Sequence, residues 1–208
     1  MTRILLSRHG ETEWNAVRRV QGWTDIPLST RGQAQAEALA SRLSRIPLAA
    51  VYSSDLSRAA QTAAPAAARH GLTVQATPEL REKGFGDWEG LTQADLERDY
   101  PDLWHRYHVA RDQNVLVPGG ETFSQVQARM AAVLSRVLAA HPGPEETVLL
   151  VGHGGSGRML VLEALQVGLP MLPRLHLDNA SLSRLDFHDG DSRVILLNDT
   201  GHLEGLTP

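Results

Sequence analysis

The hydrophobic positions of this chain fall into short apolar runs that alternate with longer stretches of helical spacing. The short runs predict strands at residues 4–7, 49–53, 73–76 and 147–151. The run at 147–151 (TVLLV) is apolar at nearly every position, which is typical of a central strand buried on both faces of a parallel sheet. Strands of this kind need helices to cover both of their faces.

Between these runs, apolar residues recur every three or four positions, as on one face of a helix. This spacing predicts helices at residues 30–45, 56–70, 95–110, 121–141 and 158–166. Phe123, Val126 and Met130 mark the apolar face of the longest of these helices. Pro65 should kink or reset the second helix and Pro101 should interrupt the third, because proline removes a backbone donor and crowds the preceding turn.

Near the carboxyl end, residues 181–187 and 193–198 read as two strands of a hairpin joined across Asp189-Gly190-Asp191. The alternation of strands and helices before this hairpin predicts one α/β domain over residues 1–208. We expect a three-layer α/β/α sandwich whose central sheet is mostly parallel, with an antiparallel edge strand. Ligands of such sheets bind at the carboxyl ends of the strands.

Composition narrows the class of protein. The net charge is −4 and 42% of residues are hydrophobic, which suits a globular chain and argues against a nucleic-acid partner. No apolar run approaches the roughly 20 residues that span a bilayer, and the first ten residues do not resemble a signal peptide. With no cysteine, disulfides and thiolate ligands are excluded, and we expect a cytoplasmic protein.

The stretch VGHGGSGRML, residues 151–160, can be interpreted in two ways. Gly152, Gly154 and Gly157 spell G-x-G-x-x-G after a predicted strand, which is the fingerprint of a dinucleotide-binding loop. That interpretation needs a second strand ending in an acid about 20 residues further on, but the segment there carries Pro170 and Pro173. The alternative is that the glycines clear space around His153.

Charged and reactive side chains stand at the ends of three predicted strands. Arg8 and His9 end the first, Arg58 follows the second, and His153 ends the strand at 147–151. Two imidazoles and two guanidinium groups in one pocket would repel each other unless an anion lies between them. Arginine favours planar, bidentate partners such as phosphate, so this pattern predicts a pocket for a phosphoryl group.

Six segments, in order along the chain, carry a resemblance to a known family: SRHGETEWN, QGWTDIPLSTRG, SSDLSRAAQTA, LREKGFGDWEG, PGGETFSQV and VGHGGSG. Together they resemble the histidine phosphatase superfamily, in the branch that contains phosphoglycerate mutases and related phosphatases. The resemblance implies that His9 attacks phosphorus and becomes phosphohistidine. It also implies that Arg8 and Arg58 bind the phosphoryl oxygens and that His153 donates to them.

The same resemblance implies further contacts with the substrate. The residues expected to bind it are Asn15, Gln21, Gly22 and Gly154. Glu82 matches the position of the general acid, and burial near Phe85 and Trp88 is expected to keep it protonated until the leaving oxygen needs a proton. The alternative for Glu82 is a surface carboxylate paired with Arg81 or Lys83.

The resemblance also implies a difference from the mutases of this family: their arginine, tyrosine and lysine are replaced here by Lys83, Phe85 and Gln93, and Lys83 is the only lysine in the chain. We therefore expect water as the acceptor and a phosphoric monoester hydrolase of the histidine acid phosphatase type. It should resemble the cofactor-independent, broad-specificity phosphatases, act on small phosphorylated metabolites and use no metal or cofactor. The alternatives are a cofactor-dependent phosphoglycerate mutase and a catalytically silent phosphate-binding domain.

Residues 91–120 are expected to set specificity, with Trp104 and Tyr107 as a possible lid over the pocket. His105 and His108 stand three residues apart on a predicted helix, but no third ligand is apparent, so a solvated helix face is preferred to a metal site. The exposed edge of the C-terminal hairpin could pair with a second copy, which makes a homodimer possible.

Overall fold

The computed structural model describes residues 1–143, 145–188 and 190–206. Within these residues, six strands form one sheet in the order β3-β2-β4-β1-β5-β6. The strands are β1 (Thr2–Arg8), β2 (Ala50–Ser54), β3 (Val74–Thr77), β4 (Glu146–Gly152), β5 (Leu182–His188) and β6 (Asp191–Asp199). The first four strands run parallel, and β5 and β6 are antiparallel additions at one edge. Asp189, in the predicted hairpin turn, lies outside the described residues.

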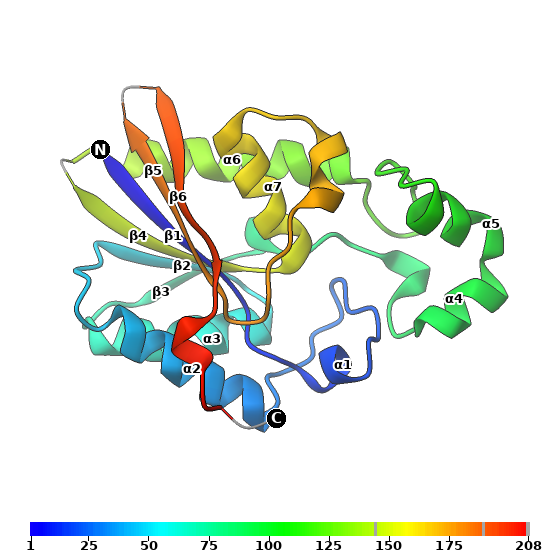
Figure 1. The fold of residues 1–208 in the computed structure, drawn as a ribbon, viewed down its shortest axis with the longest axis horizontal. Helices are drawn as coiled ribbons and strands as arrows, with labels where there is room; N and C mark the ends of the chain where they lie inside the picture. Colours follow the sequence, from blue (N-terminus) through cyan, green and yellow to red (C-terminus); the bar gives the residue numbers. More distant parts are fainter. Residues whose placement is uncertain (144, 189, 207–208) are drawn as a thin grey trace.

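Helices cover both faces of the sheet, as Figure 1 shows. The larger helices are α2 (Thr30–Leu43), α3 (Ser57–Arg69), α6 (Phe123–Ala140) and α7 (Gly154–Leu165). The pair α2 and α3 lies on one face, while α6 and α7 lie on the other. The predicted three-layer sandwich with a mostly parallel sheet is therefore confirmed.

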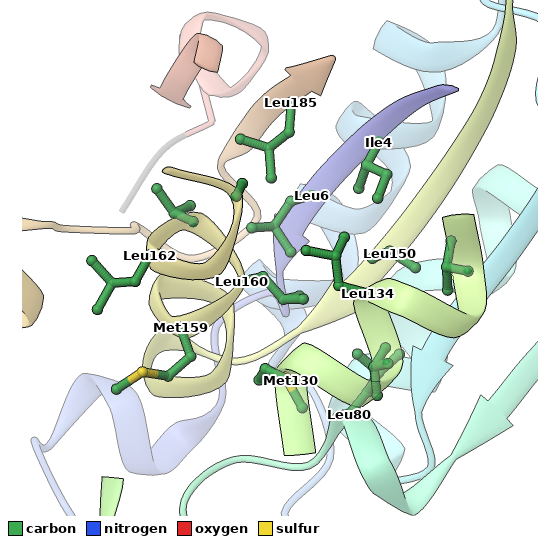
Figure 2. Packing of buried hydrophobic residues seen from close by; sticks show 14 of the residues in the cluster. Ile4, Leu6, Leu80, Met130, Leu134, Leu150, Met159, Leu160, Leu162 and Leu185 are labelled. Carbon is green, nitrogen blue, oxygen red and sulfur yellow. The ribbon is translucent and has the colours of Figure 1, made fainter. Parts of the chain in front are cut away.

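The alternation of side chains along the central strands divides the core into two halves. Leu5 on β1 and Leu149 on β4 point to α2 and α3. Ile4 and Leu150 point the other way, to α6 and α7, and Figure 2 shows this packing. Each fully buried aliphatic side chain contributes roughly 1.5–3 kcal/mol to folding, so the two halves fix the sheet between its helices.

Two predictions about helices are corrected by the structure. Helix α3 continues through Pro65, so the expected reset of the helix at that residue is wrong. Ala59, Ala63 and Ala66 of α3 itself are completely buried, and this packing maintains the helix despite the missing backbone donor. Helix α7 begins at Gly154 rather than at residue 158, because the chain turns into the helix directly after β4.

The predicted interruption near Pro101 is confirmed. The segment consists of α4 (Gln93–Asp99), α5 (Pro101–Trp104) and a π-helical turn, η3 (His105–Val109). In Figure 1, α4 and α5 extend from one side of the sandwich. They pack with η2 (Gly86–Trp88) around a separate small core, whose buried members are Trp88, Leu96, Val115 and Val117.

The remaining elements are short. They are α1 (Glu13–Ala16), η1 (Pro78–Leu80), η4 (Leu169–Arg174) and η5 (Gly201–Leu203). In the described part of the chain, none of the helices combines the length and apolar character that crossing a bilayer would require.

Candidate active site

The carboxyl ends of β1 and β4 place the two predicted catalytic histidines side by side. Arg8 pairs with Gly152 in the parallel register of these strands, and the His9 amide donates to the Gly152 carbonyl at 2.9 Å. The imidazole rings of His9 and His153 therefore stand 5.1 Å apart between centroids, with an interplanar angle of 62°. Both residues are almost fully buried.

Arg58 reaches the same pocket from the first turn of α3, after β2. It is completely buried, and its Nη1 and Nη2 donate to the carbonyls of Thr24 (2.8 Å) and Gly22 (2.7 Å). Its Nε donates to His153 Nδ1 at 3.3 Å. The guanidinium plane is thus fixed against one of the histidines before any ligand binds.

The hydrogen bonds decide which ring nitrogen of each histidine carries the proton. His9 Nδ1 lies 2.6 Å from the Gly10 carbonyl, an acceptor, so Nδ1 is protonated and the lone pair is on Nε2. His153 Nδ1 accepts from Arg58, so its proton is on Nε2. A neutral nucleophile and a neutral donor stand together in the site.

Among the described residues, three buried donors of the cavity-lining side chains have no partner. One is Trp88 Nε1 in the cavity wall; the other two, beside His9, are His153 Nε2 and Arg8 Nε. Arg8 uses its Nη1 on the Leu177 carbonyl at 2.8 Å. Buried donors are almost always satisfied, so these two atoms indicate that an acceptor, such as a phosphoryl oxygen, is the missing partner.

Burial keeps both imidazoles neutral. It lowers the pKa of His9 well below the usual 6.5, and the charges of Arg8 and Arg58 lower it further. The pKa of His153 is lowered in the same way, by burial first and then by Arg58. In the free site, burial next to two guanidinium groups therefore disfavours the charged form of both imidazoles.

Arg58 responds to burial as well. Burial lowers its pKa to about 10, and burial also lowers the pKa of Arg8. With a pKa of about 10, Arg58 remains charged at neutral pH and provides part of the positive field that a dianion requires.

Glu82 points at the start of α7. Its Oε2 accepts from the Gly155 amide (2.7 Å), and its Oε1 accepts from the amides of Ser156 (3.0 Å) and Lys83 (2.8 Å). A Cβ on Gly155 would come within 2.3 Å of Glu82 Oε1, so only glycine permits this approach. Arg81 pairs with Asp55 instead, which removes one of the two surface partners considered for Glu82.

The predicted substrate-binding residues meet the pocket in different ways. Asn15 Oδ1 and Gln21 Oε1 both accept from Thr12, at 3.1 Å and 3.0 Å, which leaves the amide N–H groups of these two side chains to act as donors. Gly22 contributes its carbonyl to Arg58. Gly154 is not among the residues that line the cavity, and its carbonyl accepts from Arg158 Nε at 2.9 Å.

A cavity of about 290 Å³ connects these groups. Eight predicted residues line it: Arg8, His9, Asn15, Gln21, Gly22, Arg58, Glu82 and His153. An aromatic and aliphatic wall completes it: Val20, Phe85, Trp88, Leu96, Trp104 and Tyr107, together with Arg19. Trp104 and Tyr107, which were expected as a lid over the pocket, line this cavity. Trp23 lies elsewhere and donates its indole N–H to the Glu82 carbonyl at 2.8 Å.

Glu89 is a residue that sequence reasoning missed. Its carboxylate accepts from the amides of Trp23 (2.9 Å), Thr24 (2.8 Å) and Phe85 (3.0 Å). It thereby joins the loop that binds Arg58 to the segment that carries Glu82. The available signal was a carboxylate directly after Trp88 in the segment FGDWEG, which also contains Asp87.

His108 stacks on the ring of Trp104 with centroids 4.6 Å apart. Among the described residues, no group of three or more histidines, aspartates or glutamates is arranged to bind a metal ion.

Sequence comparison provides an independent line of evidence. The sequence model of the histidine phosphatase superfamily (branch 1) matches residues 4–200. The chain belongs to the histidine phosphatase superfamily. In this member, the glycines after β4 serve packing rather than a dinucleotide: a Cβ on Gly157 would lie 2.9 Å from Leu177 Cδ1.

Relatives within the superfamily carry different descriptions. The bifunctional protein Rv2228c of Mycobacterium tuberculosis is 42% identical over 97% of this chain, and the chain spans about half (55%) of that relative's length. The probable phosphoglycerate mutase GpmB of Yersinia pestis is 36% identical over 98% of this chain and 96% of its own. The mycobacterial glucosyl-3-phosphoglycerate phosphatase Rv2419c, solved with VO3, is 34% identical over 95% of this chain and 99% of its own, with a TM-score of 0.87.

Proposed function

We propose that the chain hydrolyses phosphomonoesters of small metabolites through a phosphohistidine at His9, without a metal ion or other cofactor. One observation carries the proposal: the lone pair of His9 Nε2 shares a buried pocket with two unpartnered donors, His153 Nε2 and Arg8 Nε. A phosphoryl group that enters this pocket satisfies both donors and meets the nucleophile.

In the first step, His9 Nε2 attacks phosphorus, and a P–N bond forms as the bond from phosphorus to the ester oxygen breaks. Arg8 and Arg58 stabilise the charge on the transferring oxygens, and His153 Nε2 donates to one of them. Glu82 gives its proton to the leaving oxygen, because an alkoxide is a poor leaving group at neutral pH.

In the second step, water attacks phosphorus from the side that the alcohol has left. Glu82, now a carboxylate, takes the proton from this water. The P–N bond breaks, inorganic phosphate leaves, and His9 regains the lone pair on Nε2. Glu82 is again protonated for the next cycle.

The leaving-group side of the cavity supports water as the acceptor. Lys83, which replaces a mutase arginine, does not line the cavity; its ammonium lies 4.4 Å from the centroid of the Phe85 ring and is fully buried. A phosphoglycerate mutase remains the second candidate, because a relative with that description is 36% identical over nearly the whole chain.

Hydrolysis of p-nitrophenyl phosphate in the presence of a chelator tests the proposal. The protein should remain fully active, and His9→Ala should lose at least about 10⁴-fold in kcat. His70→Ala is the matched control, because His70 caps the end of α3 that lies away from Arg58. Loss of activity on chelation, or a His9→Ala protein that remains active, would overturn the mechanism.

A second assay separates the two candidates. With 3-phosphoglycerate and 2,3-bisphosphoglycerate, a phosphatase releases inorganic phosphate, whereas a mutase produces 2-phosphoglycerate without net release.

A further inference from the structure

Lys83, the only lysine of the chain, is a buried amine that the proposed mechanism does not use. It follows Glu82 directly, and its side chain is completely buried without lining the catalytic cavity. Among the described residues, its ammonium has neither a hydrogen-bond partner nor an ion-pair partner. A buried ammonium without a partner is costly, so other interactions must offset that cost.

Three aromatic rings lie against this ammonium and form a cage. Nζ lies 4.4 Å from the ring centroid of Phe85, 5.6 Å from that of Phe123 and 5.9 Å from that of Tyr107. A ring face attracts a cation within about 6 Å, most strongly where water is excluded. Phe85 and Tyr107 also line the catalytic cavity, so the ammonium lies directly behind the cavity wall.

Two carboxylates act on the ammonium, and only one of them has a cationic partner of its own. Burial lowers the pKa of Lys83 to about 8, while the charges of Glu82 and Glu121 act in the opposite direction. Glu121 is paired with Arg129 at 2.9 Å. Among the described residues, Glu82 forms no ion pair and accepts only from backbone amides. An unpaired cation and an unpaired carboxylate are therefore neighbours at the end of the cavity where the leaving oxygen needs its proton.

The other ionisable groups near the cage do not titrate near pH 8. Tyr107 stays neutral there, because burial raises its pKa to about 12 while the charge of Arg158 acts in the opposite direction. Arg129 donates to Glu121 and to the carbonyls of Glu79 and Arg81, and an arginine keeps its charge in this range. A titration of the cage near pH 8 therefore belongs to Lys83.

We propose that Lys83 is a positioning residue for the acid: its ammonium, held by the three rings, stabilises the negative charge that develops on Glu82 as the proton passes to the leaving oxygen. This inference rests on the proposed function and adds a group that acts through Glu82 without touching the substrate. The favourable effect belongs to the first step, since Glu82 loses its negative charge again in the second. The quantity that reports it is kcat/KM, which covers the steps up to release of the alcohol.

A single lysine allows the cage to be tested by NMR with carbon-13-labelled lysine, because only one side chain gives a signal. The Hε protons should lie upfield of their position in the urea-unfolded protein, since the ring currents of the cage act on them. Their titration midpoint should be about 8. Phe123→Leu removes a ring that does not line the catalytic cavity and should lower the midpoint by about half a unit. Phe187→Leu, on β5, is the matched control and should leave it unchanged.

The same titration measures the coupling to the acid without an assay of activity. Glu82→Gln removes the carboxylate charge and should lower the Lys83 midpoint by about half a unit or more, because coupling between two charges is reciprocal. Glu79→Gln is the control, since Glu79 pairs with Arg136 and does not act on Lys83.

Kinetics then test the effect on the first step. Lys83→Met keeps the length of the side chain and removes its charge. It should lower kcat/KM about tenfold for an alkyl phosphate and less than about twofold for p-nitrophenyl phosphate, whose leaving group needs little protonation. A role in packing alone would lower both values by the same factor. Arg136→Gln is the control for the loss of one positive charge outside the cavity.

The outcomes are distinguishable from a failure of the proposed function. A Lys83 midpoint that Glu82→Gln leaves unchanged overturns the inference and leaves the phosphatase in place. Equal losses for the two esters in Lys83→Met overturn it too. If the unmodified protein hydrolyses neither ester, the proposed function itself is wrong and the inference falls with it, even where the NMR titration shows the coupling.

Discussion

The two ends of the cavity are built differently. At the phosphate end, Arg8, His9 and His153 stand at the ends of adjacent paired strands, and Arg58 is fixed by two carbonyls and a histidine. At the leaving-group end, the wall comes from the short elements between residues 85 and 107, which pack around a small core of their own. In the proposed mechanism, the sheet thus fixes the groups that act on the phosphate, while recognition of the alcohol depends on a separate, irregular layer. Changes at the first end should alter kcat, and changes at the second should alter KM.

Glu82 stands between the two ends and provides the largest test of this division. Glu82→Gln should lower kcat about 10³-fold for an alkyl phosphate, because its alkoxide needs a proton. For p-nitrophenyl phosphate, whose leaving group needs little protonation, the loss should be about tenfold or less. The measurement is kcat for both esters, with Glu79→Gln as control, since Glu79 pairs with Arg136 outside the cavity. Equal losses for the two esters would remove Glu82 from the role of acid.

A change in the wall should have a smaller and different effect. Trp104 lines the cavity, and its ring meets that of Trp88 with centroids 6.2 Å apart. Trp104→Ala should raise KM for an aryl phosphate about fivefold through lost ring contact and change kcat less than twofold. Steady-state kinetics with p-nitrophenyl phosphate measures both values. A large loss in kcat with an unchanged KM would show that the two ends are not independent.

The smallest effect concerns stability rather than rate. Burial holds the pKa of His9 and of His153 below 6.5, so below pH 6.5 the unfolded chain binds protons that the folded chain does not. The stability that the two neutral imidazoles contribute to the folded chain is fully present above pH 6.5, and it is lost as the pH falls towards the lowered pKa values. Between pH 7.5 and 5.5, the unfolding free energy should fall by about 2 kcal/mol more than in the variant His9→Asn/His153→Asn.

Urea denaturation at the two pH values measures this difference. The other titrating groups are common to both proteins and cancel in the comparison. An identical fall in both would mean that the two histidines do not carry depressed pKa values in the folded chain.

The same contrast explains what the sequence could predict. The motifs around His9, Arg58 and His153 follow strand ends directly, so the register of a parallel sheet was enough to bring them together. The pattern of apolar residues also indicated the helix layers on both faces of the sheet, because residues 147–151 are apolar at nearly every position.

The other features of the fold and the site depend on packing between distant segments, which no local sequence pattern encodes. The first turn of helix α7 contains Gly155 because Glu82 approaches it closely, whereas local propensity places the start of the helix later. Arg111 and Arg158 are far apart in the sequence, yet both line one hollow together with Leu172 and Pro173 of η4. The neutral state of both imidazoles follows from their burial, and that burial depends on residues that are distant in the sequence.

The central claim is that His9 carries the phosphoryl group during turnover. Quenching the reaction in alkali preserves phosphohistidine, and mass spectrometry of the digested protein then identifies the modified residue. The account predicts a phosphoryl group on His9, formed with p-nitrophenyl phosphate and absent from His9→Ala. Turnover with the phosphoryl group on His153, or with no phosphorylated histidine at any time, would contradict it.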